Sequence, residues 1–171
     1  MQNEVDSARA LGILRRLLRS KEFAKATKLM GRISFPEKES AMVDLHSYFL
    51  LGTACENNAP AEVVRALLDL GCLPNERDKF GYTPLSKAAL SGCSAGVFDL
   101  LLRAGGEPRS MTFVGNTVLH CAVLSLVESQ SIRLLVRFGA DVFAKDRIRP
   151  ASPVCKRLPK DLIRVLGNFL V

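Results

Sequence analysis

The segment DKFGYTPLSKAALSG, residues 78–92, decides the fold of this chain. Its first four residues include Asp78 and Gly81, and both residue types are common in turns. Thr83 can cap a helix that begins with Pro84 at its first position, where the missing backbone N–H does no harm. The serine and glycine at the end of the segment interrupt that helix. The segment therefore predicts a turn followed by a short helix over about residues 84–90.

The next segment predicts a second helix that ends at a glycine. Apolar residues recur at helical spacing from Val97 to Leu102. Gly105 follows them and can adopt the left-handed conformation in which many helices end. One turn, two helices and one glycine therefore form a single structural unit.

This unit recurs at an interval of 34 residues. The interval links Gly71 to Gly105 to Gly139, Gly81 to Gly115, Thr83 to Thr117, Leu51 to Leu85 to Leu119, and Ala54 to Ala88 to Ala122. A repeat of this length indicates a solenoid, because each unit must bury its apolar face against the next one. The alanines are expected to be small so that the short helices of neighbouring units can approach closely.

The units resemble the ankyrin repeat family over about residues 44–146. The resemblance rests on Asp78-x-x-Gly81-x-Thr83-Pro84-Leu85 with Ala88-Ala89, and on Gly115-x-Thr117-Val118-Leu119-His120-x-Ala122. It implies an all-α ankyrin-repeat solenoid of paired antiparallel helices with short turn or β-finger connections. The sequence departs from the family in its period, usually about 33, in Ser86, which replaces a common histidine, and in Phe49-Leu50-Leu51, which replaces threonine-proline-leucine.

The regions that flank the repeats predict caps. Residues 1–40 form an N-terminal helical cap, with one helix opened by Asp6 or Ser7 and another running from Ser20 to Gly31. Terminal repeats are atypical because one of their faces meets water. We therefore expect the cap at 1–40, repeats within 41–146 at about 44–77, 78–110 and 112–144, and a degenerate fourth repeat or C-terminal capping helix at 147–171.

The chain has 171 residues, room for one core, and its net charge of +7 is concentrated at the ends. Residues 1–32 hold eight basic and three acidic residues, and residues 145–171 hold seven basic and two acidic ones. Such ends could meet an acidic partner or a nucleic acid. They could equally be solvated charge on two capping elements. We expect a protein partner and treat nucleic-acid binding as the lesser alternative.

The cysteines and the apolar stretches indicate in which cellular compartment the protein is expected. Cys55, Cys72, Cys93, Cys121 and Cys155 are widely spaced and form no C-x-x-C pair, so they are interpreted as small buried hydrophobes. The longest apolar stretches are far shorter than the roughly 20 residues needed to cross a bilayer. Arginines also interrupt the N-terminal region where a secretory signal would need an unbroken apolar run. We therefore expect no membrane span and a cytoplasmic or nuclear protein.

The residues that could carry chemistry favour a structural role. The resemblance implies that His120 joins hydrogen bonds between neighbouring repeats. His46 has no cysteine or acid at a ligand or catalytic spacing. The chain also lacks a phosphate-binding glycine motif. We expect no catalysis, metal, cofactor or small-molecule substrate.

A stack of such repeats presents a concave surface made of turn tips and the exposed side of the short helices. Aromatic side chains there are good binding anchors, and we place the strongest ones at Phe80, Tyr82 and Phe113. The alternative is that some of these side chains fold back onto the adjacent finger. The full set of candidate partner-binding residues is His46, Tyr48, Lys79, Phe80, Tyr82, Leu90, Phe113, Asn116, Leu124 and Arg147.

Three classes of function are therefore weighed. The first is a non-catalytic adaptor or inhibitor that occupies a partner's surface. The second is a substrate receptor of a ubiquitin ligase, because residues 158–170 weakly resemble the start of an F-box and the end of a SOCS box. That tail is too short for either module, and a terminal capping helix explains the same residues. The third is an enzyme, for which the sequence offers no constellation of catalytic residues.

Overall fold

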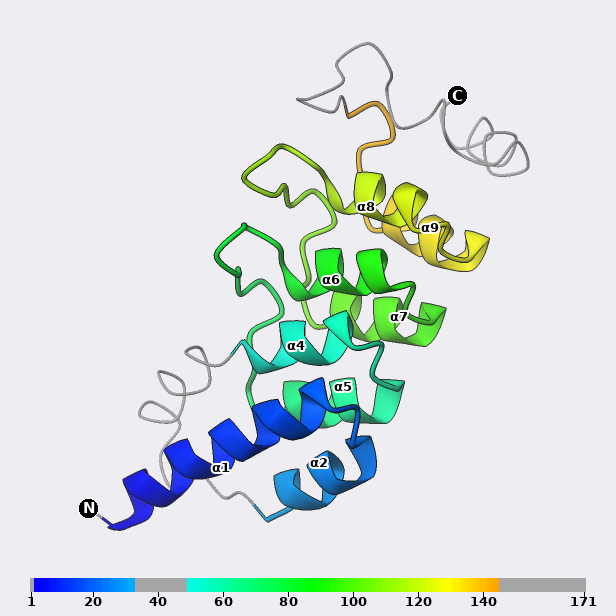
Figure 1. Cartoon of the computed structure of the whole chain (residues 1–171). Helices are drawn as coiled ribbons and strands as arrows, with labels where there is room; N and C mark the ends of the chain where they lie inside the picture. The colour runs from blue at the N-terminus through cyan, green and yellow to red at the C-terminus, as the bar shows by residue number, and fades with distance from the viewer. Residues whose placement is uncertain (1, 33–48, 145–171) are drawn as a thin grey trace.

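A computed structural model describes residues 2–32 and 49–144 (Figure 1). This part of the chain contains eight helices and no strand, with one isolated antiparallel bridge between Met111 and Thr117. The predicted all-α class is confirmed. The helices are α1 (Gln2–Arg19), α2 (Phe23–Met30), α4 (Leu50–Glu56), α5 (Ala61–Asp69), α6 (Pro84–Ser91), α7 (Ala95–Arg103), α8 (Val118–Leu124) and α9 (Ser129–Arg137).

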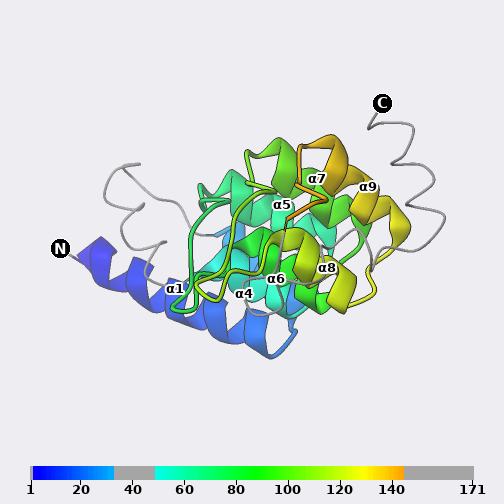
Figure 2. The ribbon, with the colours of Figure 1, turned by 90° about the horizontal axis from the view of Figure 1, so that it is seen from above.

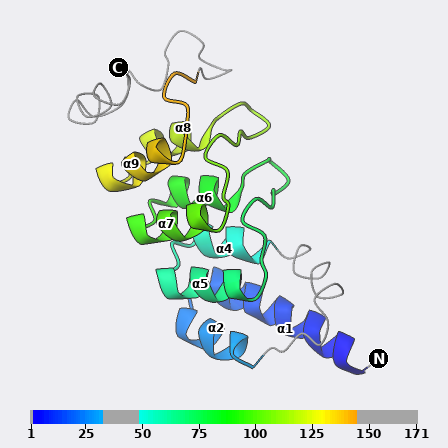
Figure 3. The ribbon, with the colours of Figure 1, turned by 180° about the vertical axis from the view of Figure 1, so that it is seen from behind.

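The helices stack as pairs in two layers. Contacts run along an inner layer of α1, α4, α6 and α8, and along an outer layer of α2, α5, α7 and α9 (Figure 3). Two long connections, residues 70–83 and 104–117, join one pair to the next, and we call them the first and second fingers. Seen along the stack, both fingers lie on one side of the two layers (Figure 2). The arrangement is the predicted solenoid.

The middle repeat has the local structure that its sequence predicts. The side chain of Thr83 caps α6 by accepting a hydrogen bond from the backbone N–H of Ser86, and Pro84 is the first helical residue. Gly92 ends the helix with a φ of 67°. Ala88 and Ala89 are fully buried, as expected for a helix packed between α4 and α8.

The first repeat replaces the threonine cap with an aromatic ring. Phe49 precedes α4 in the left-handed conformation, with a φ of 47° and no side-chain cap. A Cβ atom at Gly52 would overlap the ring of Phe49, so the glycine provides the space that the ring occupies. Thr53 donates its hydroxyl to the carbonyl of Phe49 at 2.8 Å. This exchange explains why phenylalanine and glycine stand three residues apart here.

The N-terminal helices differ from their predicted bounds. The first begins at Gln2, before Asp6 or Ser7. The second begins at Phe23 behind Glu22, so Ser20 does not open it. Ser20 instead follows the last turn of α1 and donates to the carbonyl of Leu17 at 3.2 Å. The same hydroxyl lies 3.1 Å from a carboxylate oxygen of Glu22, so Ser20 bonds within the turn between the two helices and does not cap a backbone N–H of α2.

Polar side chains join successive repeats at the same interval of 34 residues. Ser91 donates to the carbonyl of Glu56 at 2.8 Å, and Ser125 donates to that of Leu90 at 2.9 Å. In the outer part of the stack, Asn75 donates to the carbonyl of Gly105 at 2.8 Å, and Arg109 donates to that of Gly139 at 2.7 Å. Each bond satisfies a carbonyl near a helix end of the neighbouring repeat, which fixes the spacing between repeats.

One acidic residue on the first finger, Glu76, has a strongly shifted pKa. Burial raises the pKa of Glu76 to about 7, against the opposing effect of the Arg15 charge on α1. A raised carboxyl pKa means that the folded protein holds a proton that the unfolded chain releases near its ordinary pKa of about 4.3. The ionised form therefore opposes folding at neutral pH.

We predict that Gly52→Ala lowers the melting temperature, because the added methyl group displaces the Phe49 ring. Gly96→Ala on α7 is the matched control. Its Cβ would meet no atom closer than 3.9 Å, and alanine in a helix is favoured over glycine by about 0.5–1 kcal/mol. Thermal denaturation by circular dichroism measures both. In a Phe49→Ala background the cost of Gly52→Ala should vanish, and an unchanged cost there would contradict this explanation.

We predict that Glu76→Gln stabilises the protein increasingly as the pH rises. Stability due to the protonated carboxyl is present below about pH 4.3 and is lost as the pH rises through about 7. The difference in melting temperature between the variant and the wild type should thus grow from pH 4.5 to pH 8. Glu62→Gln, at an exposed site on α5, serves as the control. A difference that does not change with pH would contradict the assignment.

Candidate protein-binding surface

The inner helices and the finger tips form the candidate binding surface. Phe80 on the first finger is 56% exposed, and Phe113 on the second is 66% exposed. Leu90 and Leu124, at the ends of α6 and α8, are 37% and 60% exposed. Lys79 is exposed as well. Three other residues of the predicted set, His46, Tyr48 and Arg147, lie outside the described part of the chain.

The two exposed phenylalanines are brought together by contact between the fingers. The backbone N–H of Phe113 donates to the carbonyl of Phe80 at 3.1 Å. The Phe113 ring also lies against Gly81, where a Cβ would come within 2.9 Å of it. One face of this ring therefore rests on the adjacent finger, as the alternative interpretation expected, while two thirds of the side chain remains exposed. The ammonium of Lys79 stands 4.9 Å from the centre of the Phe80 ring.

Asp78 and Arg77 hold the first finger in shape. One carboxylate oxygen of Asp78 accepts the backbone N–H groups of Phe80 and Tyr82, both at 2.9 Å. Burial opposes ionisation of Asp78, but hydrogen bonds from Tyr82, Lys87 and Phe80 lower its pKa below the usual value. Arg77 donates to the carbonyl of Met111 at 2.6 Å, which links the first finger to the second. The finger tips are therefore positioned before any partner arrives.

Lys87 on α6 connects two repeats at the floor of the surface. Its ammonium lies 3.1 Å from Asp78 and 3.2 Å from Glu56 on α4. Burial would lower the pKa of Lys87, but the hydrogen bonds to Asp78 and Glu56 raise it. The same ammonium is 5.1 Å from the centre of the Tyr82 ring. Tyr82 is half-buried against the core, so it supports this network more than it projects from the surface.

Asn116 also belongs to the finger itself. It is half-buried, its backbone N–H donates to the Thr112 hydroxyl at 3.1 Å, and its carbonyl accepts the Thr112 N–H at 2.9 Å. The exposed residues of the predicted binding set therefore fall into two groups. Lys79, Phe80 and Phe113 lie at the finger tips, and Leu90 and Leu124 lie at the far ends of the inner helices.

A residue that the sequence reasoning missed lies beside Leu124. A left-handed residue follows each inner helix, with φ values of 59° at Lys21 after α1, and of 56° at Asn58, 67° at Gly92 and 51° at Leu126 in the three repeats. Asparagine and glycine tolerate this conformation, whereas leucine is strained in it by about 1 kcal/mol or more. Leu126 is nevertheless 87% exposed. An alignment of the repeats at the 34-residue interval would have shown that leucine stands at position 126, where the two earlier repeats have asparagine and glycine.

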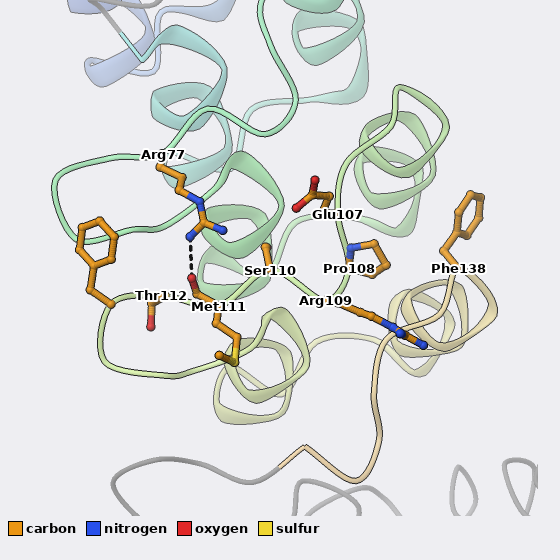
Figure 4. A pocket seen from close by; sticks show the side chains of 9 residues that line it. Arg77, Glu107, Pro108, Arg109, Ser110, Met111, Thr112 and Phe138 are labelled. Carbon is orange, nitrogen blue, oxygen red and sulfur yellow. Dashed lines mark hydrogen bonds between the residues drawn. The ribbon is translucent and has the colours of Figure 1, made fainter.

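An open depression of about 740 Å³ lies at the base of the fingers (Figure 4). Its lining residues are Arg77, Glu107, Pro108, Arg109, Ser110, Met111, Thr112, Phe113 and Phe138. The guanidinium groups of both arginines donate to backbone carbonyls. Arg77 donates to the carbonyls of Gly81 and Met111, and Arg109 donates to that of Gly139. The depression is thus bordered by the bonds that join one repeat to the next.

The histidine and the thiols of the described chain are parts of the packing. His120 is buried, and its Nδ1 lies 2.8 Å from the Thr117 hydroxyl in a capping box at the start of α8. Cys55, Cys72, Cys93 and Cys121 are buried free thiols, as the sequence predicts. Burial raises the pKa of Cys93 and of Cys121 to about 11, which keeps both protonated at neutral pH. Cys155 lies outside the described residues.

The described residues also lack two kinds of feature. Among residues 2–32 and 49–144, no group of three or more histidine, cysteine, aspartate or glutamate side chains could hold a metal ion. No helix in that part of the chain is long and apolar enough to span a membrane.

Three curated proteins are similar to this chain over roughly half of its length. NF-kappa-B inhibitor alpha of Sus scrofa is 38% identical over 105 residues, which cover 56% of this chain and 32% of that protein. NF-kappa-B inhibitor alpha of Homo sapiens is 38% identical over 106 residues, covering 56% and 31%. Ankyrin repeat and SOCS box protein 16 of Mus musculus is 32% identical over 89 residues, covering 52% and 19%. The chain therefore spans a third or less of the length of these relatives.

A family model described as ankyrin repeats, in three copies, matches residues 51–146. The match covers more than half of the chain and coincides with the three helix pairs α4–α5, α6–α7 and α8–α9. Ankyrin repeats are a protein-interaction module. The chain belongs to the ankyrin repeat family.

Proposed function

We propose that the protein is a non-catalytic adaptor or inhibitor that binds a partner protein through the concave surface of its fingers and inner helices. The observation that carries this proposal is the pair of exposed aromatic rings, Phe80 and Phe113, on two fingers bonded to each other. The exposed parts of the two phenylalanine side chains do not help the monomer bury apolar surface. A partner that covers them would gain that burial.

The rigidity of the fingers supports the same conclusion. The backbone near Phe80 is held by Asp78, and the backbone of Phe113 is held by Phe80 itself. A preorganised surface loses little conformational entropy on binding, so more of the contact energy appears as affinity. Aromatic anchors of this kind contribute about 2 kcal/mol or more each at a good interface.

The relatives support an inhibitory or an adaptor role without deciding between them. Two of them are named as inhibitors of NF-kappa-B. Because this chain covers about a third of their length, the same partner is not assigned to it. The four buried, unpaired thiols fit the reducing cytoplasm or nucleus in which we propose that the protein acts.

A second candidate function is a substrate receptor of a ubiquitin ligase. The similarity to a mouse protein named for ankyrin repeats and a SOCS box favours it, together with the resemblance of residues 158–170 to part of such a box. That tail lies outside the described residues. Purification of the full chain from cells, with and without residues 158–171, tests this function. Loss of a co-purifying cullin adaptor upon truncation would support it, and its absence from both samples would dismiss it.

We predict that Phe80→Ala combined with Phe113→Ala weakens partner binding by roughly 30-fold or more, from the loss of at least one anchor of about 2 kcal/mol. The melting temperature should change little, because most of both side chains is exposed. Affinity purification with mass spectrometry, comparing wild type and variant, identifies the partner, and biolayer interferometry then measures its affinity.

Phe143→Ala provides the matched control for this experiment. Phe143 is 57% exposed but follows the last helix pair and belongs to neither finger. The control variant should bind like the wild type. A large fall in melting temperature of the double variant, or an affinity equal to that of the control, would sink the proposal.

A further inference from the structure

Helix α1, at the N-terminal end of the stack, has one buried face and one exposed face (Figure 1). Its fully buried residues belong to the core and are Leu11, Leu14 and Leu18. Arg9, Ile13 and Arg16 follow one another at intervals of four and three residues, so at 3.6 residues per turn they share the opposite side of the helix. All three side chains are exposed, Ile13 by 43%. We call these three residues the arginine face.

The basic charge around the arginine face is largely unpaired. Residues 1–32 hold eight basic and three acidic residues, whereas residues 49–144 hold eight basic and nine acidic ones. Among the described residues, Lys25 is the one basic side chain of residues 2–32 that forms an ion pair, and its partner is Glu22. The charges of Arg9 and Arg16 are therefore open to another molecule.

Folding of the monomer gains little from this face. Arg16 lies in the last turn of α1, where a cation interacts favourably with the helix dipole, but Arg9 lies near the middle of the helix and beyond that effect. Arg15 and Arg19 stand four residues apart on the same helix, and like charges at this spacing repel. Ile13 leaves apolar surface in water. A partner that pairs the charges and covers the isoleucine would supply what the fold does not.

The composition of the arginine face favours an acidic protein segment over a nucleic acid. Arginine pairs well with both carboxylates and phosphates, because both match its planar fork of donors. A protein segment can place an apolar side chain between two acidic ones, whereas a nucleic-acid backbone presents phosphates and sugars. Single-stranded nucleic acids also stack their bases on aromatic side chains. The one aromatic residue among residues 2–32 is Phe23, and it packs against the core.

The rest of this chain offers one segment of the required charge. Residues 49–144 are nearly neutral, and residues 145–171 hold seven basic and two acidic residues, so neither part of a second copy complements the face. Residues 33–48 hold three acidic residues and one basic residue. This segment lies outside the described residues and is treated below as a competing occupant.

The helix geometry sets the order of the groups that the face can bind. Arg9 and Arg16 are seven residues apart on one helix, which corresponds to about 10.5 Å along its axis, and Ile13 lies between them. A segment that contacts all three residues presents an acidic, then an apolar, then an acidic side chain. Arginine side chains are long and flexible, so a helix and an extended segment can both meet this requirement.

We propose that the arginine face docks an acidic segment of a partner protein, with an apolar residue between two carboxylates. The carboxylates pair with Arg9 and Arg16, and the apolar residue covers Ile13. This inference goes beyond the proposed function, because it assigns a second binding surface and the chemistry of its ligand. The finger tips take no part in it, so the Phe80→Ala and Phe113→Ala variant should bind such a segment like the wild type.

The first experiment selects a probe for the arginine face. A phage-displayed library of random 16-residue peptides is selected on the full chain and counter-selected on the combined Arg9→Gln and Arg16→Gln variant, which removes peptides that bind elsewhere. We expect the recovered peptides to carry an excess of acidic residues, with an apolar residue between two of them. Recovery of no peptide, or of peptides without this pattern, would overturn the inference.

The second experiment measures the affinity of the recovered peptides by fluorescence anisotropy. The affinity for the Arg9→Gln and Arg16→Gln variant should fall roughly fivefold or more, because two exposed charge pairs are lost. Ile13→Ser should also weaken binding, because less apolar surface is buried. The matched control combines Arg65→Gln and Arg133→Gln, which removes two exposed arginines from α5 and α9 and gives the same net charge. An equal loss of affinity in the control would show that net charge alone attracts the peptides and would overturn the inference.

An exchange of charges tests the direct contact. Arg9→Glu combined with Arg16→Glu should lose the original peptide and bind a version whose two flanking acidic residues are changed to lysine. Circular dichroism verifies that this variant is folded. Failure of the exchange in a folded variant would show that the two arginines do not pair with the peptide and would overturn the inference.

The last experiment examines the two competing occupants. A 16-base-pair DNA duplex is titrated at about 50 mM salt, where phosphate contacts are strong. If it binds the wild type more tightly than the peptides do and loses affinity for the Arg9→Gln and Arg16→Gln variant, the ligand is a nucleic acid. If the peptides bind only after Glu37→Gln, Glu39→Gln and Asp44→Asn are combined, the chain itself covers the face. Either result would overturn the inference, and tight peptide binding that neither change improves would support it.

Discussion

The close approach of the short inner helices is the constraint on which the rest of this structure depends. Ala54, Ala88, Ala89 and Ala122 are fully buried between α4, α6 and α8. Small side chains let adjacent helices pack at the short end of the usual interaxial range. This spacing repeats along the stack, so whatever is attached to one repeat is placed at a regular distance from its equivalent in the next. The fingers and the turns are therefore spaced at the same regular interval as the helices.

Polar bonds convert this stacking into a rigid surface. Four side chains each bond a backbone carbonyl of a neighbouring repeat: Asn75, Arg109, Ser91 and Ser125. Lys87 on α6 also pairs with Glu56 on α4 and with Asp78 on the first finger. These bonds satisfy groups that would otherwise be unpaired near helix ends. The exposed side chains between them are therefore presented in a defined arrangement, which suits a protein that recognises a surface more than one that surrounds a small ligand.

Departures from the repeat pattern divide into those that the fold compensates and one that it does not. Phe49 replaces a capping threonine, and Gly52 provides the space for its ring. Ser86 replaces a histidine, and its hydroxyl still lies 3.1 Å from the Thr83 hydroxyl that caps α6. Leu126 replaces a residue suited to a left-handed backbone, and no neighbour buries its side chain.

The sequence by itself determined the class of fold, the repeat and the local helix signals. Thr83, Pro84 and Gly92 act within a few residues of one another, so the start and end of α6 could be predicted without its neighbours. The buried thiols followed in the same way from spacing and from the lack of a paired motif. Only the tertiary structure decided that Tyr82 is half-buried near Lys87, that Phe113 rests on Gly81, and that Leu126 is exposed. Those outcomes depend on how each finger packs against the core and against the neighbouring repeat, and a local sequence pattern does not encode that packing.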